Sequence, residues 1–228
     1  MSSYVNPSLA LFEQFAAVAR ALGHPYRLMV LQLLGQGETA VEVLAARAGM
    51  NVANTSQHLQ RLRRAGLVVS RKERQKVLYR LADDAVLGLV AALRQLAERN
   101  LAEARELIQS YFRARDSLEP LSRTELLRRI KHRQVTVLDV RSAEEFTSGH
   151  LPGAVNIPLK ELRRRLKELE PSQKVVAYCR GPYCIFSYEA VAELRKHGYQ
   201  ALRLEDGYPE WKAAGFPIQT SADPRDQR

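Results

Sequence analysis

The chain has 228 residues, which suits two domains better than one because domains most often run to ~100–150 residues. Hydrophobic residues make up 46% of it and charged residues 26%, the balance of a globular protein, which excludes a disordered or low-complexity chain. No apolar run approaches the ~18 residues of a membrane span, and residues 1–10 lack the order of a signal peptide, so we expect a cytoplasmic protein with no membrane partner.

The net charge of +10 is concentrated in one part of the chain. Residues 1–118 carry 16 Lys and Arg against 10 Asp and Glu, and residues 119–228 carry 19 against 15, whereas residues 51–80 alone carry eight basic residues against one acid, Glu73. A solvated helix face followed by a charged hairpin would account for such a run. Its density nevertheless favours nucleic acid as the partner.

The first predicted helix, over residues 9–22, has two adjacent apolar stripes: Leu11, Phe15, Val18 and Leu22, then Leu9, Phe12, Ala16 and Ala19. A long helix predicted over residues 83–112 repeats the pattern with Val86, Leu89, Val90, Leu93, Leu96 and Ala97. A surface helix normally has one apolar stripe, so we predict that these two helices also pack against a second subunit in a homodimer. The alternative is a monomeric bundle that buries both stripes within one chain.

Residues 38–68 have the order of a helix-turn-helix. A short helix over residues 41–47 is followed by a turn at residues 48–50 and by a second helix, for which Asn51 is a suitable N-cap and Gly66 a suitable C-terminal stop. In this motif the second helix enters the major groove of DNA. Residues 68–81 then predict a β-hairpin with a basic tip, a wing that would lie along the phosphates.

These segments, with residues 20–24, 27–34, 54–59, 62–68 and 79–81, resemble ArsR-type winged-helix repressors over residues 8–112. The resemblance implies a dimer that pairs through its first and last helices and binds double-stranded operator DNA. It also implies that second-helix residues face base edges and phosphates and that wing residues grip the DNA backbone: Asn54, Thr55, Ser56, Gln57, His58 and Arg61 for the helix, and Arg71, Lys72, Arg74 and Lys76 for the wing. For His58, a partly packed helix histidine is the alternative.

The sequence departs from the metal-sensing members of that family. Those members bind metals through cysteines on the helix before the recognition helix, or through acidic and histidine residues on the last helix. Here residues 38–49 contain no Cys and residues 83–100 no His. We therefore predict no metal site and no cofactor, and an effector that is sensed in another part of the chain.

A second domain is predicted after a linker. The helical periodicity of the first half lapses around residues 116–122. Ser122 and Glu125 then have the spacing of a capping box, which indicates the start of a new helix. Short apolar runs at residues 135–140, 175–178 and 201–204 then alternate with helical stretches, which indicates an α/β domain with a parallel sheet. We thus predict a mainly α winged helix-turn-helix domain over 1–116, a linker over 117–121, an α/β domain over 122–220 and a tail over 221–228.

The two cysteines of the chain, Cys179 and Cys184, flank a loop between a predicted strand and a predicted helix. Two cysteines cannot build a disulfide framework, so reactive or redox chemistry is the better reason for their presence. A cysteine at a strand-to-helix turn faces backbone N–H groups and the helix dipole, which should lower its pKa, and Arg180 could add positive charge. An inert buried cysteine is the alternative, although the neighbouring Gly181 and Pro182 indicate a shaped loop.

Four ordered motifs, at residues 138–146, 149–158, 179–184 and 205–211, closely resemble a single-domain rhodanese over residues 120–220. Rhodaneses transfer sulfane sulfur through a cysteine persulfide. The resemblance implies that Cys179 accepts the sulfur, that Asp139 and Arg141 form an internal pair that holds the loop, and that His150 is structural. A related phosphatase would need arginine where Ile185 stands. Cys184 departs from the family pattern and could act as a resolving thiol.

Together the two halves predict a homodimeric transcription regulator whose rhodanese module senses reactive sulfur or redox state at Cys179. Its partners would be operator DNA and a sulfane-sulfur donor or thiol acceptor. Two alternatives stay open: a working sulfurtransferase tethered to a DNA-binding domain, and a repressor with an inactive rhodanese interaction domain.

Overall fold

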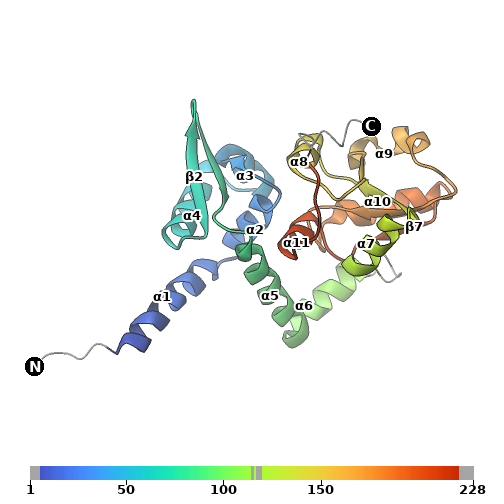
Figure 1. Ribbon diagram of the computed structural model, residues 1–228. Helices are drawn as coiled ribbons and strands as arrows, with labels where there is room; N and C mark the ends of the chain where they lie inside the picture. Colours follow the sequence, from blue (N-terminus) through green and yellow to red (C-terminus); the bar gives the residue numbers. More distant parts are fainter. Residues whose placement is uncertain (1–5, 114–115, 117–119, 221–228) are drawn as a thin grey trace, which may run out of the picture. The chain divides into compact units, whose positions relative to one another are not determined.

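The computed structural model describes residues 6–113, 116 and 120–220 and divides into two compact units, Met1–Val86 and Leu87–Arg228 (Figure 1). Each unit is described by itself below. The predicted tail, 221–228, and residues 117–119 of the predicted linker lie outside the described residues. Across the described ranges, no helix has both the length and the apolar character needed to cross a membrane.

The first unit is a winged helix-turn-helix. Its elements are the helices α1 (Pro7–Leu22), α2 (Pro25–Leu34), α3 (Val41–Ala48) and α4 (Val52–Arg64) and the strands β1 (Thr39–Ala40), β2 (Val68–Glu73) and β3 (Lys76–Leu81). The strands form an antiparallel sheet in the order β1-β3-β2, in which Val68 lies opposite Leu81 and Glu73 opposite Lys76. The predicted hairpin and both helices of the helix-turn-helix are therefore confirmed.

Local chemistry fixes the turn and the ends of α4. Gly49 ends α3 with φ +64°, in the left-handed region that favours glycine. The side chain of Asn51 accepts a hydrogen bond of 2.8 Å from the Asn54 amide, as an N-cap does, and Gly66 follows α4 with φ +73°. Leu59 and Leu62 are fully buried on the inner face of the helix. The caps and the buried face thus agree with the sequence prediction.

Helix α1 leaves its apolar side chains in solvent. Leu9, Phe12 and Phe15 are 60%, 64% and 55% exposed, and only Leu22 on this helix is buried. The alternative of a monomeric bundle that buries both stripes is therefore wrong for α1.

The second unit starts with a helical segment that is less regular than predicted. In place of one helix over residues 83–112 there are α5 (Ala85–Asn100), α6 (Ala102–Leu107) and a π-helical turn, η1 (Ile108–Arg113). The break is at Leu101, whose backbone is extended (φ −100°, ψ 121°). Asn100, which precedes it, is a weak helix former. On α5, Leu89, Leu93 and Leu96 remain 40–48% exposed.

The rest of the second unit is an α/β sandwich around a parallel sheet. Its strands lie in the order β5-β4-β6-β7, and all pairs are parallel. Its remaining elements are α7 (Arg123–Lys131), β4 (Val135–Asp139), α8 (Ala143–Ser148), β5 (Val155–Asn156), α9 (Leu159–Arg165), η2 (Leu166–Glu168), β6 (Lys174–Tyr178), α10 (Ile185–Lys196), β7 (Ala201–Arg203) and α11 (Tyr208–Ala213). The predicted parallel sheet is confirmed, whereas the short β5 was not predicted.

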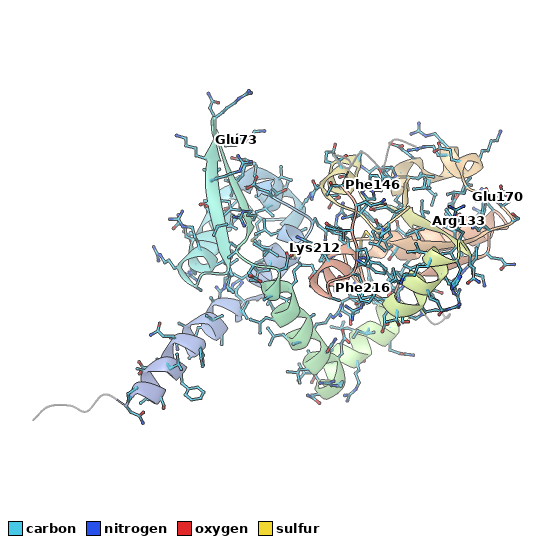
Figure 2. All side chains as sticks on the ribbon, in the orientation of Figure 1. Glu73, Arg133, Phe146, Glu170, Lys212 and Phe216 are labelled. Carbon is cyan, nitrogen blue, oxygen red and sulfur yellow. A yellow bond between two sulfur atoms is a disulfide. The ribbon has the colours of Figure 1, made fainter. Side chains whose placement is uncertain are left out.

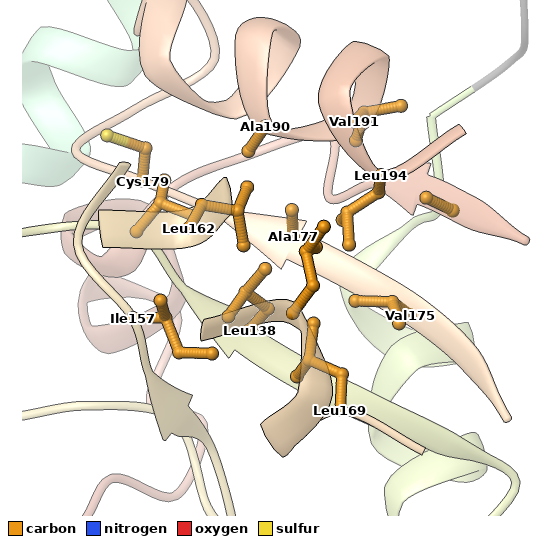
Figure 3. Packing of buried hydrophobic residues seen from close by; sticks show 13 residues of the cluster. Leu138, Ile157, Leu162, Leu169, Val175, Ala177, Cys179, Ala190, Val191 and Leu194 are labelled. Carbon is orange, nitrogen blue, oxygen red and sulfur yellow. The ribbon is translucent and has the colours of Figure 1, made fainter. Parts of the chain in front are cut away.

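The sheet has a core on each face. On one face, side chains of β4 and β6 pack against α9 and α10 (Figure 3): Leu138, Val175 and Ala177 against Leu162, Ala190, Val191 and Leu194. On the other face, Val137, Val176 and Tyr178 lie with Leu126 of α7 and Trp211 of α11. Both faces are covered, as expected for strands that read as continuous apolar runs.

The capping prediction for α7 is half right. Ser122 is the N-cap and accepts from the Glu125 amide at 3.4 Å, but the Glu125 carboxylate binds Arg128 and Arg129 at 2.7 Å. These hydrogen bonds lower the pKa of Glu125 to about 2. Ser142 and Glu145 form the reciprocal capping box, at the start of α8.

A buried ion pair lies at the carboxyl edge of the sheet. Asp139 ends β4, and Arg141 follows it, with both side chains fully buried and 2.6 Å apart. The guanidinium of Arg141 also donates to the Gly149 carbonyl at 2.8 Å and lies 4.4 Å from the ring centre of Tyr208. The hydroxyl of Tyr178, on β6, donates to Asp139. Asp139 and Arg141 thus form a buried pair, as the resemblance implies, and its role in holding the loop stays a prediction.

This pair generates the first prediction. Asp139→Asn leaves the Arg141 charge buried without its counter-ion, so we expect the free energy of unfolding to fall by about 3–5 kcal/mol. Trp211 is the one tryptophan of the chain and is fully buried in this unit, so its fluorescence during urea denaturation reports the change. Glu125→Gln, in an exposed ion pair, is the matched control and should change stability little. An Asp139→Asn variant as stable as this control would contradict the prediction.

Candidate functional site

Some of the residues of α4 that were predicted to contact DNA are exposed to solvent, and others are buried. Asn54, Gln57 and Arg61 are exposed, and Ser56 is half-buried. Thr55 is fully buried, and its hydroxyl donates to the Asn51 carbonyl at 2.9 Å. The prediction that Thr55 faces base edges is therefore wrong, because this side chain is part of the core.

His58 of α4 packs against other rings. Its ring centre lies 4.5 Å from that of His24 and 6.1 Å from that of Tyr26. Burial lowers the pKa of His58, and the charges of His24, Arg27 and Arg61 lower it further, so the neutral form is favoured. This environment is that of the packed helix histidine, the alternative to a base contact.

The wing presents its basic side chains near its tip. Lys72, Arg74 and Lys76 are exposed, and Arg74 makes the turn with φ +54°. Arg71 differs, because it bonds to Glu38 at 2.6 Å and to Glu73 at 2.8 Å (Figure 2 labels Glu73). The hydrogen bonds that Arg71 donates to these two carboxylates raise its pKa. Two acidic side chains thus already neutralise Arg71 in the free protein.

In the second unit, the cysteine loop (residues 179–184) joins β6 to α10. Tyr178 ends the strand, and Cys184 is the N-cap of α10, which begins at Ile185. A disulfide joins Cys179 and Cys184, whose Cα atoms are 6.1 Å apart. Cys179 is fully buried, whereas Cys184 is partly exposed. The strand-to-helix placement of the loop agrees with the sequence prediction.

Gly207 and Tyr208 hold the loop from outside. A Cβ atom on Gly207 would lie 2.1 Å from the Gly181 nitrogen, so only glycine allows this approach. The Tyr208 amide donates to the Cys179 carbonyl at 3.0 Å. Both residues stand in the 205–211 motif, but no role was predicted for them, since the contact forms only when α11 packs beside the loop.

Arg180 does not act as a free positive charge beside the cysteines. Its guanidinium makes two hydrogen bonds of 2.7 Å to the Glu145 carboxylate of α8 and lies 5.2 Å from the ring centre of Phe186. Glu145 is 4% exposed, so the pair is largely desolvated. Arg180 therefore anchors the loop to α8.

Tyr183 connects the loop to α5. Its hydroxyl donates to the Glu98 carboxylate, and its ring centre lies 4.8 Å from that of Phe112. Burial raises the pKa of Tyr183, and the hydrogen bond to Glu98 raises it further. The sequence predicted neither residue, because 85 positions separate them.

The remaining predicted residues have structural environments. His150 is 2% exposed, its ring stacks on Phe146 with centres 3.7 Å apart, and its Nδ1 lies 2.9 Å from the Phe146 carbonyl oxygen. Within residues 6–113, 116 and 120–220, no three His, Cys, Asp or Glu side chains gather as a metal site would require.

Both halves of the chain match known families. The Helix-turn-helix domain family matches residues 22–71, and the Rhodanese-like domain family matches residues 122–214. The HTH-type transcriptional regulator Rv0324 of Mycobacterium tuberculosis is 40% identical over 222 residues, which are 97% of this chain and 97% of that protein. A sulfurtransferase of Allochromatium vinosum is 34% identical over 85 residues, 37% of this chain and 78% of that protein.

Among solved structures, the homodimeric winged helix-turn-helix DNA-binding domain of a Mycobacterium bovis protein is 39% identical, with a TM-score of 0.41 over 45% of this chain and 95% of that one. Two domain matches and a relative that is similar along nearly the whole length agree on one arrangement. The chain belongs to the HTH-type transcriptional regulators, as a member in which an ArsR-type winged helix-turn-helix precedes a rhodanese-like domain.

Proposed function

We propose that this transcriptional regulator binds operator DNA as a homodimer and senses sulfane sulfur at its cysteine loop. The observation that carries the proposal is the placement of Cys179 and Cys184 within disulfide reach in a rhodanese-like loop, on a chain that also carries a helix-turn-helix. The 34% identity of this part to a protein named sulfurtransferase supports sulfur as the signal.

The chemistry needs only the two cysteines and the donor. In the reduced loop, the Cys179 thiolate attacks the outer sulfur of a donor RS–SH, an S–S bond forms on Cys179, and RS⁻ leaves. The Cys184 thiolate then attacks the Cys179 Sγ and expels the added sulfur as HS⁻. The two thiols are oxidised to the disulfide, and the sulfane sulfur is reduced to sulfide.

The bridge can be reopened from its exposed end. Because Cys179 is buried and Cys184 is partly exposed, an incoming thiolate reaches the Cys184 sulfur more readily. The mixed disulfide then forms on Cys184, and Cys179 leaves as the thiolate. A cellular thiol would therefore return Cys179 to the state that accepts sulfur.

The second candidate function is a working sulfurtransferase tethered to the DNA-binding unit, which the same loop and the same relative favour. Steady turnover of thiosulfate and cyanide, with no change of DNA affinity, would support it. If polysulfide leaves both cysteines of the loop unmodified, the remaining candidate is a repressor with an inactive rhodanese interaction domain.

The dimer is proposed from the exposed apolar faces. Leu9, Phe12 and Phe15 on α1, in the first unit, and Leu89, Leu93 and Leu96 on α5 are large apolar side chains left in solvent. On each helix, taken by itself, these side chains are neighbours on one face, and contiguous exposed apolar surface marks interaction sites. A second copy of the chain is the occupant that the sequence stripes predict.

A charge on α5 tests the dimer. Leu93→Glu would place a carboxylate in an apolar interface, so we expect monomers that bind operator DNA poorly, because two half-sites contacted together bind far better than one. Sedimentation velocity measures the first effect and a DNA-binding titration the second. Lys131→Glu, on α7 and in neither stripe, is the control. An intact dimer in Leu93→Glu would place the interface elsewhere.

The DNA interface is tested by comparing wing and helix. Lys76→Ala should weaken binding to all sequences alike and reduce the slope of log affinity against log salt concentration by about one. Gln57→Ala should instead reduce the preference for operator over random DNA. Thr55→Ser, at a buried position, should leave this preference unchanged. Altered base preference in Lys76→Ala with an unchanged salt slope would contradict the assignment.

The sulfur chemistry is tested by peptide mapping with mass spectrometry after polysulfide treatment of the reduced protein. Cys179→Ser should gain no sulfur at position 184 and form no bridge. Cys184→Ser should accumulate a persulfide on Cys179, because no second thiol displaces it. First modification at Cys184, or an unchanged mass on both cysteines, would overturn the sensor proposal.

A further inference from the structure

The cysteine loop and α5 are joined by two sets of contacts. Directly, the Tyr183 hydroxyl donates to the Glu98 carboxylate. Less directly, Arg94 of α5 lies 3.4 Å from Asp206 and 3.8 Å from Glu210. Asp206 immediately precedes Gly207, the residue against which the loop packs.

Helix α5 has different surroundings on its two faces. Residues on an α-helix are about 100° apart around the axis. Glu98 therefore points about 140–180° away from Leu89, Leu93 and Leu96, the exposed apolar stripe, and Arg94 about 100–160° away. One face of α5 thus contacts the cysteine loop, while the opposite face is the proposed dimer surface.

The bridge is one of the restraints on Tyr183. Tyr183 immediately precedes Cys184, so the disulfide to Cys179 closes a ring that includes it. Arg180 is anchored to Glu145, and Gly181 is packed against Gly207. Opening the bridge therefore removes one restraint from the Tyr183–Cys184 end of the loop, which the Cys184 amide still links to the Gly181 carbonyl at 3.1 Å, while the contacts of the first half are unchanged.

We propose that Tyr183 and Glu98 transmit the state of the cysteine loop to α5, so that closing or opening the Cys179–Cys184 bridge changes how firmly this helix is held. The inference rests on the proposed function, since it names how that site regulates the protein. The hydroxyl of Tyr183 stays protonated at neutral pH and can donate throughout, because its pKa is raised. Glu98 is further held by Arg94, one turn earlier on α5, at 3.4 Å.

The test uses the full-length protein in its reduced and bridged states, with mass spectrometry to establish the state of the loop in each sample. Hydrogen exchange of peptides covering residues 92–100 measures how firmly α5 is held, and a titration with operator DNA measures the regulatory outcome. The variants are Tyr183→Phe, which keeps the ring and removes the hydroxyl, and Glu98→Ala. Tyr199→Phe is the matched control, because its hydroxyl donates to the Leu166 carbonyl, away from α5.

In the wild type and in Tyr199→Phe, bridging should slow exchange in residues 92–100 and change DNA affinity by about 5- to 150-fold, the usual range of allosteric coupling. In Tyr183→Phe the bridge should still form, but both responses should fall below about twofold. Glu98→Ala should lose as much, and the double variant no more, because the two residues act through one contact. Glu98→Gln keeps an acceptor and should retain part of the response.

The outcomes separate this inference from the function on which it rests. A loop that bridges without any change in α5 exchange in the wild type overturns the coupling, whatever the DNA affinity does. A full response in Tyr183→Phe also overturns it. A change in α5 exchange with unchanged DNA affinity supports the coupling and overturns the proposed sensing function instead.

Discussion

The buried pair of Asp139 and Arg141 is the constraint on which the candidate site depends. Two fully desolvated charges are stable only when each has its partners, and a parallel sheet brings the ends of β4 and β6 together to supply them. Burial raises the pKa of Tyr178, and the charge of Asp139 raises it further, so the phenol stays protonated and donates to Asp139. Since Cys179 follows Tyr178 directly, satisfying this pair also fixes where the first sulfur lies.

The two halves of the cysteine loop are held by different contacts. Its first half is immobilised by the Tyr208 amide on the Cys179 carbonyl, by the ion pair of Arg180 and by the close approach of Gly207 to Gly181. Its second half, Tyr183 and Cys184, is held by the disulfide, by the contacts of Tyr183 with Glu98 and Phe112, and by the hydrogen bond from the Cys184 amide to the Gly181 carbonyl. In the proposed coupling, opening the bridge therefore removes a restraint from the half of the loop that contacts α5.

The helices and strands could be predicted from local sequence signals, whereas contacts between residues far apart in the sequence could not. Gly49, Asn51 and the strand-to-helix position of Cys179 each have a meaning within a few residues, so the helix-turn-helix and the loop were predictable. The burial of Thr55 was available too, because it lies four and seven residues before the buried Leu59 and Leu62 and so shares their helix face. The pairing of Arg180 with Glu145 and the contact of Tyr183 with Glu98 had no such local signal, since their partners are far away in the sequence. The break at Leu101 follows Asn100, a weak helix former, which alone does not predict that a helix ends.

A helix suits the role proposed for α5 because its two faces are mechanically joined. A hydrogen bond gained or lost at Glu98 acts on the same rigid rod that carries Leu93 and Leu96, so no chain of side-chain rearrangements is needed between them. The energy available is modest, since one hydrogen bond to a charged group contributes about 1.5–3 kcal/mol, but this equals about a 10- to 150-fold change in an equilibrium. A symmetric interface between two copies of the chain contains each contact twice. The two loops of a dimer would therefore contribute twice the free energy of one loop. In the proposed coupling, a small movement of the cysteine loop can therefore shift the equilibrium at the much larger dimer surface.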